Sequence, residues 1–127
     1  MDYKLPISVK GIILKENKVI LLRNERNEWE LPGGRLEHGE TLEKALTREI
    51  NEELGIYCSI DKLNDVWVYE VYQDREVLII TFICNSADSS NVVISNEHLE
   101  YKWFPVSELE SLNMPQGYKD SIRRATS

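Results

Sequence analysis

One stretch, GRLEHGETLEKALTREINEELGI from Gly34 to Ile56, limits the folds open to this chain more than any other. Its second half has the signals of a single helix. Thr41 is a favourable N-cap, residues 42–54 are all tolerated in helices, and Gly55 suits the left-handed position that often follows a helix end. The sequence therefore predicts a helix over residues 42–54 that is entered from a glycine-containing loop.

Acidic side chains continue the apolar stripe of this helix. At about 100° per residue, Leu42, Leu46 and Ile50 share one face. Carboxylates gather over the last turns, at Glu49, Glu52 and Glu53. Two unit charges about 6 Å apart repel by roughly 3 kcal/mol at an effective dielectric constant of about 20. Arg48 alone cannot neutralise this charge, whereas hard divalent cations with oxygen ligands can.

The spacing of the fixed residues in this stretch resembles the Nudix box. Gly34 and Glu40 precede the run REINEE over residues 48–53, and Gly55 and Ile56 close the pattern, so that every fixed position is filled. The LPGG segment before it and the acidic segment that runs into Trp103 are also similar to the family. The resemblance implies hydrolysis of a nucleoside diphosphate linked to another moiety, with Mg²⁺ or Mn²⁺ as cofactor.

The rest of the chain reads mainly as strands. Residues 7–14 and 19–22 predict an antiparallel hairpin, and Pro32-Gly33-Gly34 predicts a tight turn. Further strands are predicted over residues 29–31, 56–60, 65–72, 76–84 and 101–104, a polar loop over 85–91 followed by more strand-like sequence, and short helices over 106–112 and 115–125. Hairpins with single helices between them favour an α+β fold or an α/β/α sandwich with a mixed sheet, and the resemblance implies the Nudix-like fold.

Length and composition exclude several other classes. A chain of 127 residues with 42% hydrophobic and 29% charged residues is expected to form one globular domain over residues 1–127. Its start lacks the apolar region of a secretory signal and no apolar run is long enough to cross a bilayer, so a cytoplasmic protein is the expectation. The net charge of −7 argues against nucleic acid or a membrane surface as partner. Cys58 and Cys84 are interpreted as buried free thiols.

The resemblance assigns roles to the box residues and to their neighbours. Glu49, Glu52 and Glu53 are the expected metal ligands and catalytic residues, and we take Glu52 as the base that activates water and Glu53 mainly as a ligand. Further metal ligands are expected at the Gly33 carbonyl, at Glu40 and at Glu97 from the segment 96–100, with Glu100 as the alternative to Glu97 and Glu37 as a weaker candidate. Gly34, Arg48 and Gly55 are expected to be structural, with Arg48 orienting a box glutamate.

Substrate contacts are harder to assign from the sequence. Arg23, Arg26 and Arg35 flank the glycine segment and are candidates for phosphate or ribose contacts, although exposed loop arginines are common. Trp29 is a candidate for stacking on a nucleobase, as are Trp67, Tyr69 and Trp103, but aromatic residues in strands are typical of a core. His38 and His98 are interpreted as surface histidines, because the proposed chemistry needs no imidazole.

These observations leave more than one function open. The first hypothesis is a metal-dependent pyrophosphohydrolase acting on a nucleoside triphosphate, ADP-ribose, a sugar nucleotide or a dinucleoside polyphosphate. The alternative is a non-catalytic sensor of the same fold that binds a nucleotide, which a degenerate box would favour. A third hypothesis is a structural metal-binding helix without a substrate. The sequence does not identify the substrate, and it is compatible with a homodimer without fixing an interface.

Overall fold

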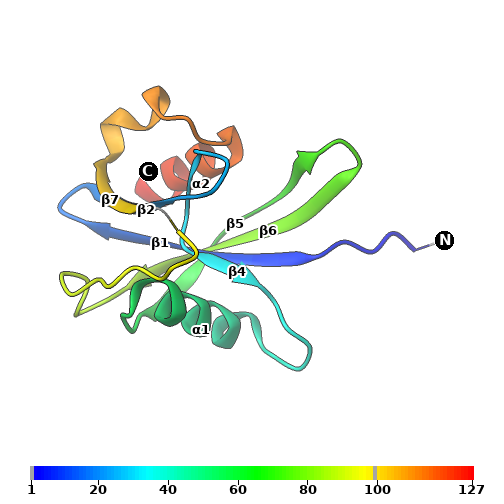
Figure 1. Cartoon of the computed structure of the whole chain (residues 1–127), viewed down its shortest axis with the longest axis horizontal. Coiled ribbons are helices and arrows are strands. Elements are labelled where there is room, and N and C mark those ends of the chain that lie inside the picture. Colours follow the sequence, from blue (N-terminus) through cyan, green and yellow to red (C-terminus); the bar gives the residue numbers. More distant parts are fainter. Residues whose placement is uncertain (1, 99) are drawn as a thin grey trace.

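The computed structural model describes residues 2–98 and 100–127, in which a mixed sheet lies between two helices. Figure 1 shows α1 (Leu42–Leu54) on one face of the sheet and α2 (Gln116–Thr126) on the other. The strands are β1 (Ile7–Lys15), β2 (Lys18–Arg23), β3 (Trp29–Glu30), β4 (Gly33–Arg35), β5 (Ser59–Tyr72), β6 (Arg75–Asn85) and β7 (Glu100–Pro105), and a 3₁₀ helix, η1 (Val106–Ser111), precedes α2. The predicted sandwich with a mixed sheet is confirmed.

Strand β1 is the centre of this arrangement. The strand order is β3-β2-β1-β6-β5, with β4 paired to β1 and β7 paired to β2. β1 and β6 run parallel, with Val9 opposite Ile80, whereas β1 pairs antiparallel with β4 near Lys10 and with β2 near Leu14. Strand β4 also contacts α1, so that Gly33 and Gly34 lie beside Glu53 and Glu49 of the helix.

The predicted turn at Pro32-Gly33-Gly34 is wrong, because Gly33 opens strand β4 and pairs with Lys10. Gly33 has a φ of +139°, which favours glycine, and a Cβ on it would lie 2.0 Å from the carbonyl oxygen of Val9. The close backbone approach that the glycines permit is therefore made to β1. Because Gly33 and Val9 are far apart in the sequence, the residues around Gly33 alone do not indicate this contact.

Other strand boundaries also differ from the prediction. Residues 56–58 of the strand expected over 56–60 are not a strand, whereas residues 59–60 and the strand expected over 65–72 belong to the single long strand β5. The pairing of β5 with β6 shifts register at three places. The strand-like sequence after the 85–91 loop, residues 92–94, is not a strand, because its backbone bonds to the end of α1. The two-residue hairpin loop Glu16–Asn17 has positive φ at both positions, which matches the twist of the flanking strands.

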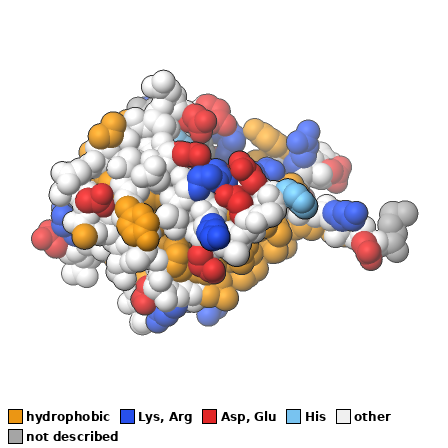
Figure 2. All heavy atoms as spheres, turned by 90° about the horizontal axis from the view of Figure 1, so that it is seen from below, with side chains coloured by type: hydrophobic (Ala, Val, Ile, Leu, Met, Phe, Trp, Pro, Cys, Tyr) orange, Lys and Arg blue, Asp and Glu red, His pale blue; other side chains and the backbone are white. Residues whose placement is uncertain are grey.

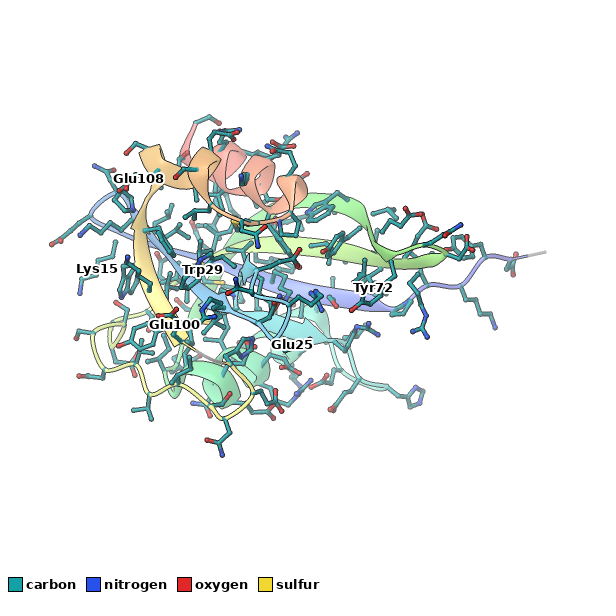
Figure 3. The ribbon with its side chains drawn as sticks, turned by 45° about the horizontal axis from the view of Figure 1, so that its top comes forward. Lys15, Glu25, Trp29, Tyr72, Glu100 and Glu108 are labelled. Carbon is teal, nitrogen blue, oxygen red and sulfur yellow. The ribbon has the colours of Figure 1, made fainter. Side chains whose placement is uncertain are left out.

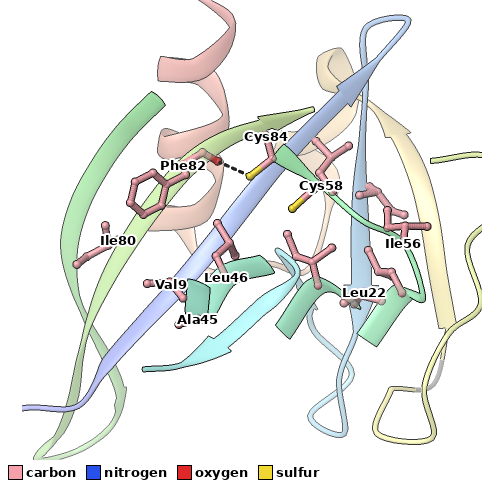
Figure 4. Close-up of a cluster of buried hydrophobic side chains, with 13 residues drawn as sticks. Val9, Leu22, Ala45, Leu46, Ile56, Cys58, Ile80, Phe82 and Cys84 are labelled. Carbon is pink, nitrogen blue, oxygen red and sulfur yellow. Dashed lines mark hydrogen bonds between the residues drawn. The ribbon is translucent and has the colours of Figure 1, made fainter. Parts of the chain in front are cut away.

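Helix α1 runs over the predicted residues. The Thr41 hydroxyl accepts a hydrogen bond from the Lys44 N–H at 3.2 Å, and Gly55 ends the helix in the left-handed conformation. The buried side of the helix packs on the sheet in a cluster that includes Leu46, Leu22 and Phe82 (Figure 4). Cys58 and Cys84 lie in the same cluster as free, buried thiols, as predicted. This packing fixes where the acidic end of α1 lies relative to the sheet.

Helix α2 covers the opposite face through a second cluster. Tyr118 and Ile122 are buried there against Ile12 of β1 and Ile79 of β6. The 3₁₀ helix η1 adds Leu109 to this cluster. Within residues 2–98 and 100–127, no helix is long and apolar enough to cross a membrane.

Candidate active site

Arg48 is the centre of an ion-pair cluster on the exposed side of α1. Its guanidinium donates to both carboxylate oxygens of Glu40, at 2.7 and 3.0 Å, and to Glu49 Oε1 at 2.9 Å. Glu52 lies at 3.4 Å and Glu37 at 3.7 Å. The hydrogen bonds from Arg48 lower the pKa of Glu40, and those to Glu40 and Glu49 raise the pKa of Arg48. Figure 2, which views the face covered by α1, shows basic and acidic side chains interspersed there.

Glu53 differs from these glutamates because it is buried, with 4% of its surface exposed. Its Oε1 accepts a hydrogen bond of 2.6 Å from the backbone N–H of Gly33. Burial raises the pKa of Glu53 to about 7, although the charge of Lys10 and the Gly33 N–H lower it in part. The last turn of α1 thus contains one buried carboxylate that is poised to titrate near neutral pH.

The loop before β7 places an imidazole against this carboxylate. His98 Nε2 lies 3.5 Å from Glu53 Oε2 and 3.2 Å from Glu30 Oε1. The prediction of a surface histidine is wrong for His98, since its side chain is only 8% exposed. Burial tends to lower the pKa of His98, but the hydrogen bond to Glu30 and the charge of Glu53 raise it overall. His98 therefore links the buried carboxylate of Glu53 to the partly buried carboxylate of Glu30.

A buried lysine compensates the charge of this group. Lys10 lies within the apolar run of β1, and its Nζ donates to the carbonyl oxygen of Leu31 at 3.2 Å. Burial acts to raise the pKa of Glu30, but Lys10, His98 and Asn24 lower it to about 2. Lys10, Glu30, His98 and Glu53 are called the buried charge network below. Sequence reasoning did not single out Lys10 or Glu30, although a lysine inside a β-branched strand was a signal that a buried anion faces it.

The metal ligand predicted in the segment before β7 is Glu97, which directly precedes His98. The segment before β7 docks on the end of α1, where the Ser95 N–H donates to the carbonyl oxygen of Glu53 at 2.9 Å. Glu97 is exposed, whereas the side chain of His98 contacts Glu53. Glu52 is 58% exposed beside Arg48, in contact with solvent. Leu99, inside the predicted acidic segment, lies outside the described residues.

The predicted substrate contacts are mostly engaged with other side chains. Arg23 and Glu100 lie opposite each other on β2 and β7 and form an ion pair at 2.6 Å. The Trp29 ring packs edge-on against Phe104, with ring centres 4.7 Å apart. Figure 3 shows Trp29 beside β7 and Glu100 at the start of that strand. Trp29 therefore acts as a packing residue in this structure.

Arg35, a predicted phosphate or ribose contact, is exposed at the surface. Its carbonyl oxygen accepts a hydrogen bond of 3.3 Å from Arg48 Nη2, which ties its backbone to the ion-pair cluster. Its side chain lines a cavity of about 180 Å³ together with Lys10, Glu30 and Tyr118. This cavity, called the inner cavity below, also includes Arg26 and Tyr69 in its wall. Two members of the buried charge network, Lys10 and Glu30, thus lie in the wall of this cavity.

The residues at the end of α1 fit a divalent cation by their chemistry. All the side-chain donors of Glu49, Glu52 and Glu53 are carboxylate oxygens, which Mg²⁺ and Mn²⁺ prefer. Gly34 leaves room for one of them, because a Cβ at Gly34 would lie 2.5 Å from the Glu49 carboxyl carbon. Among residues 2–98 and 100–127, no group of three or more His, Cys, Asp or Glu side chains is arranged to hold a metal ion. In this structure the carboxylates of Glu49 and Glu53 contact Arg48, His98 and the Gly33 N–H.

Comparison with known proteins settles the family. The model of the NUDIX domain matches residues 4–125. This chain belongs to the Nudix hydrolase family. As a Nudix chain, it is 30% identical over 111 residues to the uncharacterized Nudix hydrolase YvcI of Bacillus subtilis, covering 84% of this chain and 70% of that one. It is 32% identical over 111 residues to an ADP-ribose pyrophosphatase of Methanocaldococcus jannaschii, covering 84% and 65%.

A solved structure supports the same assignment. The crystal structure of a MutT protein from Methanosarcina mazei superposes with a TM-score of 0.84 at 27% identity, and the match covers 98% of this chain and 94% of that one. The fold and the box spacing of this Nudix chain therefore agree.

Proposed function

We propose that this Nudix hydrolase cleaves a phosphoanhydride bond in a nucleotide-type substrate, by attack of water on phosphorus, with Mg²⁺ or Mn²⁺ as cofactor. The observation that carries this proposal is the buried carboxylate of Glu53, held by the Gly33 N–H at 2.6 Å beside the further carboxylates of Glu49 and Glu52. Carboxylates at one helix end are suited to hold cations, which neutralise the charge that develops on phosphoryl oxygens.

The three box glutamates differ in their surroundings, which suggests different roles. Glu53 is fixed and buried, and Glu49 is oriented by Arg48, so both are suited to hold a cation in one geometry. Glu52 is exposed to solvent and is therefore the candidate for the base that takes a proton from water. In the step, the water oxygen bonds to phosphorus, the bridging P–O bond breaks, and the departing phosphate keeps that electron pair.

The outer ligand positions remain part of this proposal. The Gly33 carbonyl is a candidate ligand because its N–H already anchors Glu53. Glu40 has both oxygens on Arg48, so it would serve a metal only by sharing that contact. Glu97 is exposed two residues beyond Ser95, whose N–H binds the carbonyl oxygen of Glu53, and its side chain would have to turn toward the helix.

Hydrolysis by purified protein tests the proposal. Wild-type chain with Mg²⁺ or Mn²⁺ is offered nucleoside triphosphates, ADP-ribose, a sugar nucleotide and a dinucleoside polyphosphate, and released phosphorylated products are separated by ion-exchange chromatography. Glu52→Gln is expected to lose at least about a hundredfold in kcat, the usual contribution of a general base. Glu43→Gln, at the exposed first turn of the same helix, is the matched control and should retain turnover.

Three outcomes contradict the proposal. They are the absence of hydrolysis for every substrate, full activity of Glu52→Gln, and full activity in EDTA. Nucleotide binding without any turnover would instead support the sensor hypothesis.

A further inference from the structure

Both oxygens of the Glu53 carboxylate meet groups from outside α1. Oε1 accepts the hydrogen bond of 2.6 Å from the Gly33 N–H, and Oε2 lies 3.5 Å from His98 Nε2. A carboxylate that is held at one oxygen can still turn about that contact, whereas contacts at both oxygens select one orientation. The side chain of His98 is therefore the second of the two groups that fix how the Glu53 carboxylate lies.

The ring of His98 presents a donor to the carboxylates beside it. Glu30, whose pKa is about 2, is ionised at neutral pH and can only accept a hydrogen bond. Its Oε1 lies 3.2 Å from His98 Nε2. Among residues 2–98 and 100–127, no group forms a hydrogen bond with the buried Nδ1 of His98. Nε2 therefore carries a hydrogen, and it faces both Glu30 and Glu53.

Glu30 is itself held from a second side. Its Oε2 accepts a hydrogen bond of 3.3 Å from Asn24 Nδ2. Asn24 is buried, and its Oδ1 accepts hydrogen bonds from two backbone N–H groups of the loop between β2 and β3. Glu30 also lies in the wall of the inner cavity. The contacts thus form a chain that runs from this loop through Glu30 and His98 to Glu53.

The backbone of the segment before β7 is attached to the same helix end. The Ser95 N–H donates to the carbonyl oxygen of Glu53 at 2.9 Å, and the Val93 N–H donates to that of Leu54 at 2.8 Å. The last carbonyl groups of a helix have no partner inside it, so these bonds satisfy them. In Figure 1 this segment, in yellow, runs beside α1. The segment therefore meets Glu53 twice, with its backbone at Ser95 and with the side chain of His98.

Neither packing nor charge alone accounts for an imidazole at this place. Lys10 already places a positive charge near the carboxylates of Glu30 and Glu53 and lowers the pKa of both. A leucine could fill the space of the ring. What His98 adds is a directional contact at Glu53 Oε2, and contacts of this kind orient metal ligands in proteins.

We propose that His98 is a positioning residue for Glu53, which it holds in the orientation in which this carboxylate binds a divalent cation. Glu30 anchors His98 in this role. The inference rests on the proposed function, in which Glu53 is mainly a metal ligand. It gives the segment before β7 a role that requires no metal contact by His98.

Mn²⁺ binding measures this role without turnover. The dissociation constant is measured by electron paramagnetic resonance at one fixed pH, with the fold of each variant checked by circular dichroism. His98→Leu removes the donor and should weaken Mn²⁺ binding by about 10- to 100-fold, the usual cost of losing the partner of a metal ligand. His98→Gln should recover most of the affinity, because its amide nitrogen carries two hydrogens and can donate to both carboxylates. His38→Leu, at the other histidine of the chain, which is exposed, should bind Mn²⁺ as wild type does.

Hydrolysis gives a second measurement, on the substrate that wild type hydrolyses fastest. The Mg²⁺ concentration for half-maximal kcat should rise about 10- to 100-fold in His98→Leu, and saturating Mg²⁺ should restore most of kcat. Equal Mn²⁺ binding by wild type and His98→Leu overturns the inference. So does a loss that His98→Gln does not recover, because the donor is then not its cause.

If His98→Leu does not fold, the wild-type protein decides the question. The chain has two histidines, so nitrogen-15 spectra of the imidazole rings are simple to assign. Saturating Mg²⁺ should shift the Nε2 signal of His98, and an unchanged signal overturns the inference. Mn²⁺ binding that depends on His98 in a protein that hydrolyses no substrate supports the positioning role and refutes the proposed function. Hydrolysis together with Mn²⁺ binding that His98→Leu leaves unchanged refutes the positioning role alone.

Discussion

The buried position of Glu53 predicts that the metal-free protein loses stability as pH rises through neutrality. The ordinary carboxyl pKa of 4.5 applies in the unfolded chain, whereas burial raises the pKa of Glu53 to about 7 in the folded protein. Between these values the folded state holds the proton and the unfolded state has released it, so stability falls with rising pH. At about 1.4 kcal/mol per pH unit, the loss is about 3 kcal/mol.

The contributions of Glu30 and His98 to stability between pH 5 and pH 8 follow from the directions of their pKa shifts. The pKa of Glu30 is lowered to about 2, so its contribution is complete above the unfolded value of 4.5 and stays constant from pH 5 to pH 8. The pKa of His98 is raised, so its contribution is present below its ordinary value of 6.5 and is lost as pH rises through the higher folded value. His98 therefore adds to the loss that Glu53 causes.

Urea unfolding followed by tryptophan fluorescence measures the effect. In EDTA, wild type should be about 3 kcal/mol less stable at pH 8 than at pH 5, and Glu53→Gln should lose much less. Glu52→Gln, which alters an exposed carboxylate one residue away, should keep the wild-type loss. Mg²⁺ or Mn²⁺ should restore part of the stability at pH 8, because a bound cation favours the ionised carboxylate. Equal wild-type stability at the two pH values, or an undiminished loss in Glu53→Gln, would refute the reasoning.

Three further substitutions test the surroundings of the box. Gly34→Ala places a Cβ 2.5 Å from the Glu49 carboxyl carbon, so Mn²⁺ affinity measured by electron paramagnetic resonance should fall about tenfold or more with an unchanged circular dichroism spectrum. Arg48→Lys replaces the two-pronged contact to Glu40 by a single ammonium, and kcat/KM should fall about tenfold while urea unfolding shows a loss of about 1 kcal/mol or less. Thr41→Ala removes the N-cap and should cost about 1 kcal/mol in urea unfolding with unchanged kcat, and a large loss of kcat there would contradict a purely structural cap.

The helix that carries the box was predictable because its signals are local. Thr41, the apolar stripe and Gly55 all act within one or two turns, and the structure places the helix at the predicted residues. The mixed sheet followed from strand patterns and from the family resemblance. Strand boundaries were less accurate where pairing decides them, as in β5, which continues through three register shifts along β6.

The buried charge network could not be predicted because its members meet only in the fold. His98 lies against Glu30, which is 68 residues away in the chain, and nothing near either residue marks it as buried. Lys10 was the one local sign, since a charged residue in the middle of an apolar strand requires a buried partner. The role of Gly33 could not be predicted from the sequence either, because its backbone lies close to Val9 on a neighbouring strand.

The most direct test of the whole account is the metal-dependent hydrolysis of a nucleoside diphosphate conjugate by wild type and by Glu52→Gln. With ADP-ribose and Mg²⁺, we predict turnover by wild type, none in EDTA, and a loss of at least about a hundredfold in kcat for Glu52→Gln with its fold intact. Turnover that persists in EDTA, or that is unchanged in Glu52→Gln, would contradict the account.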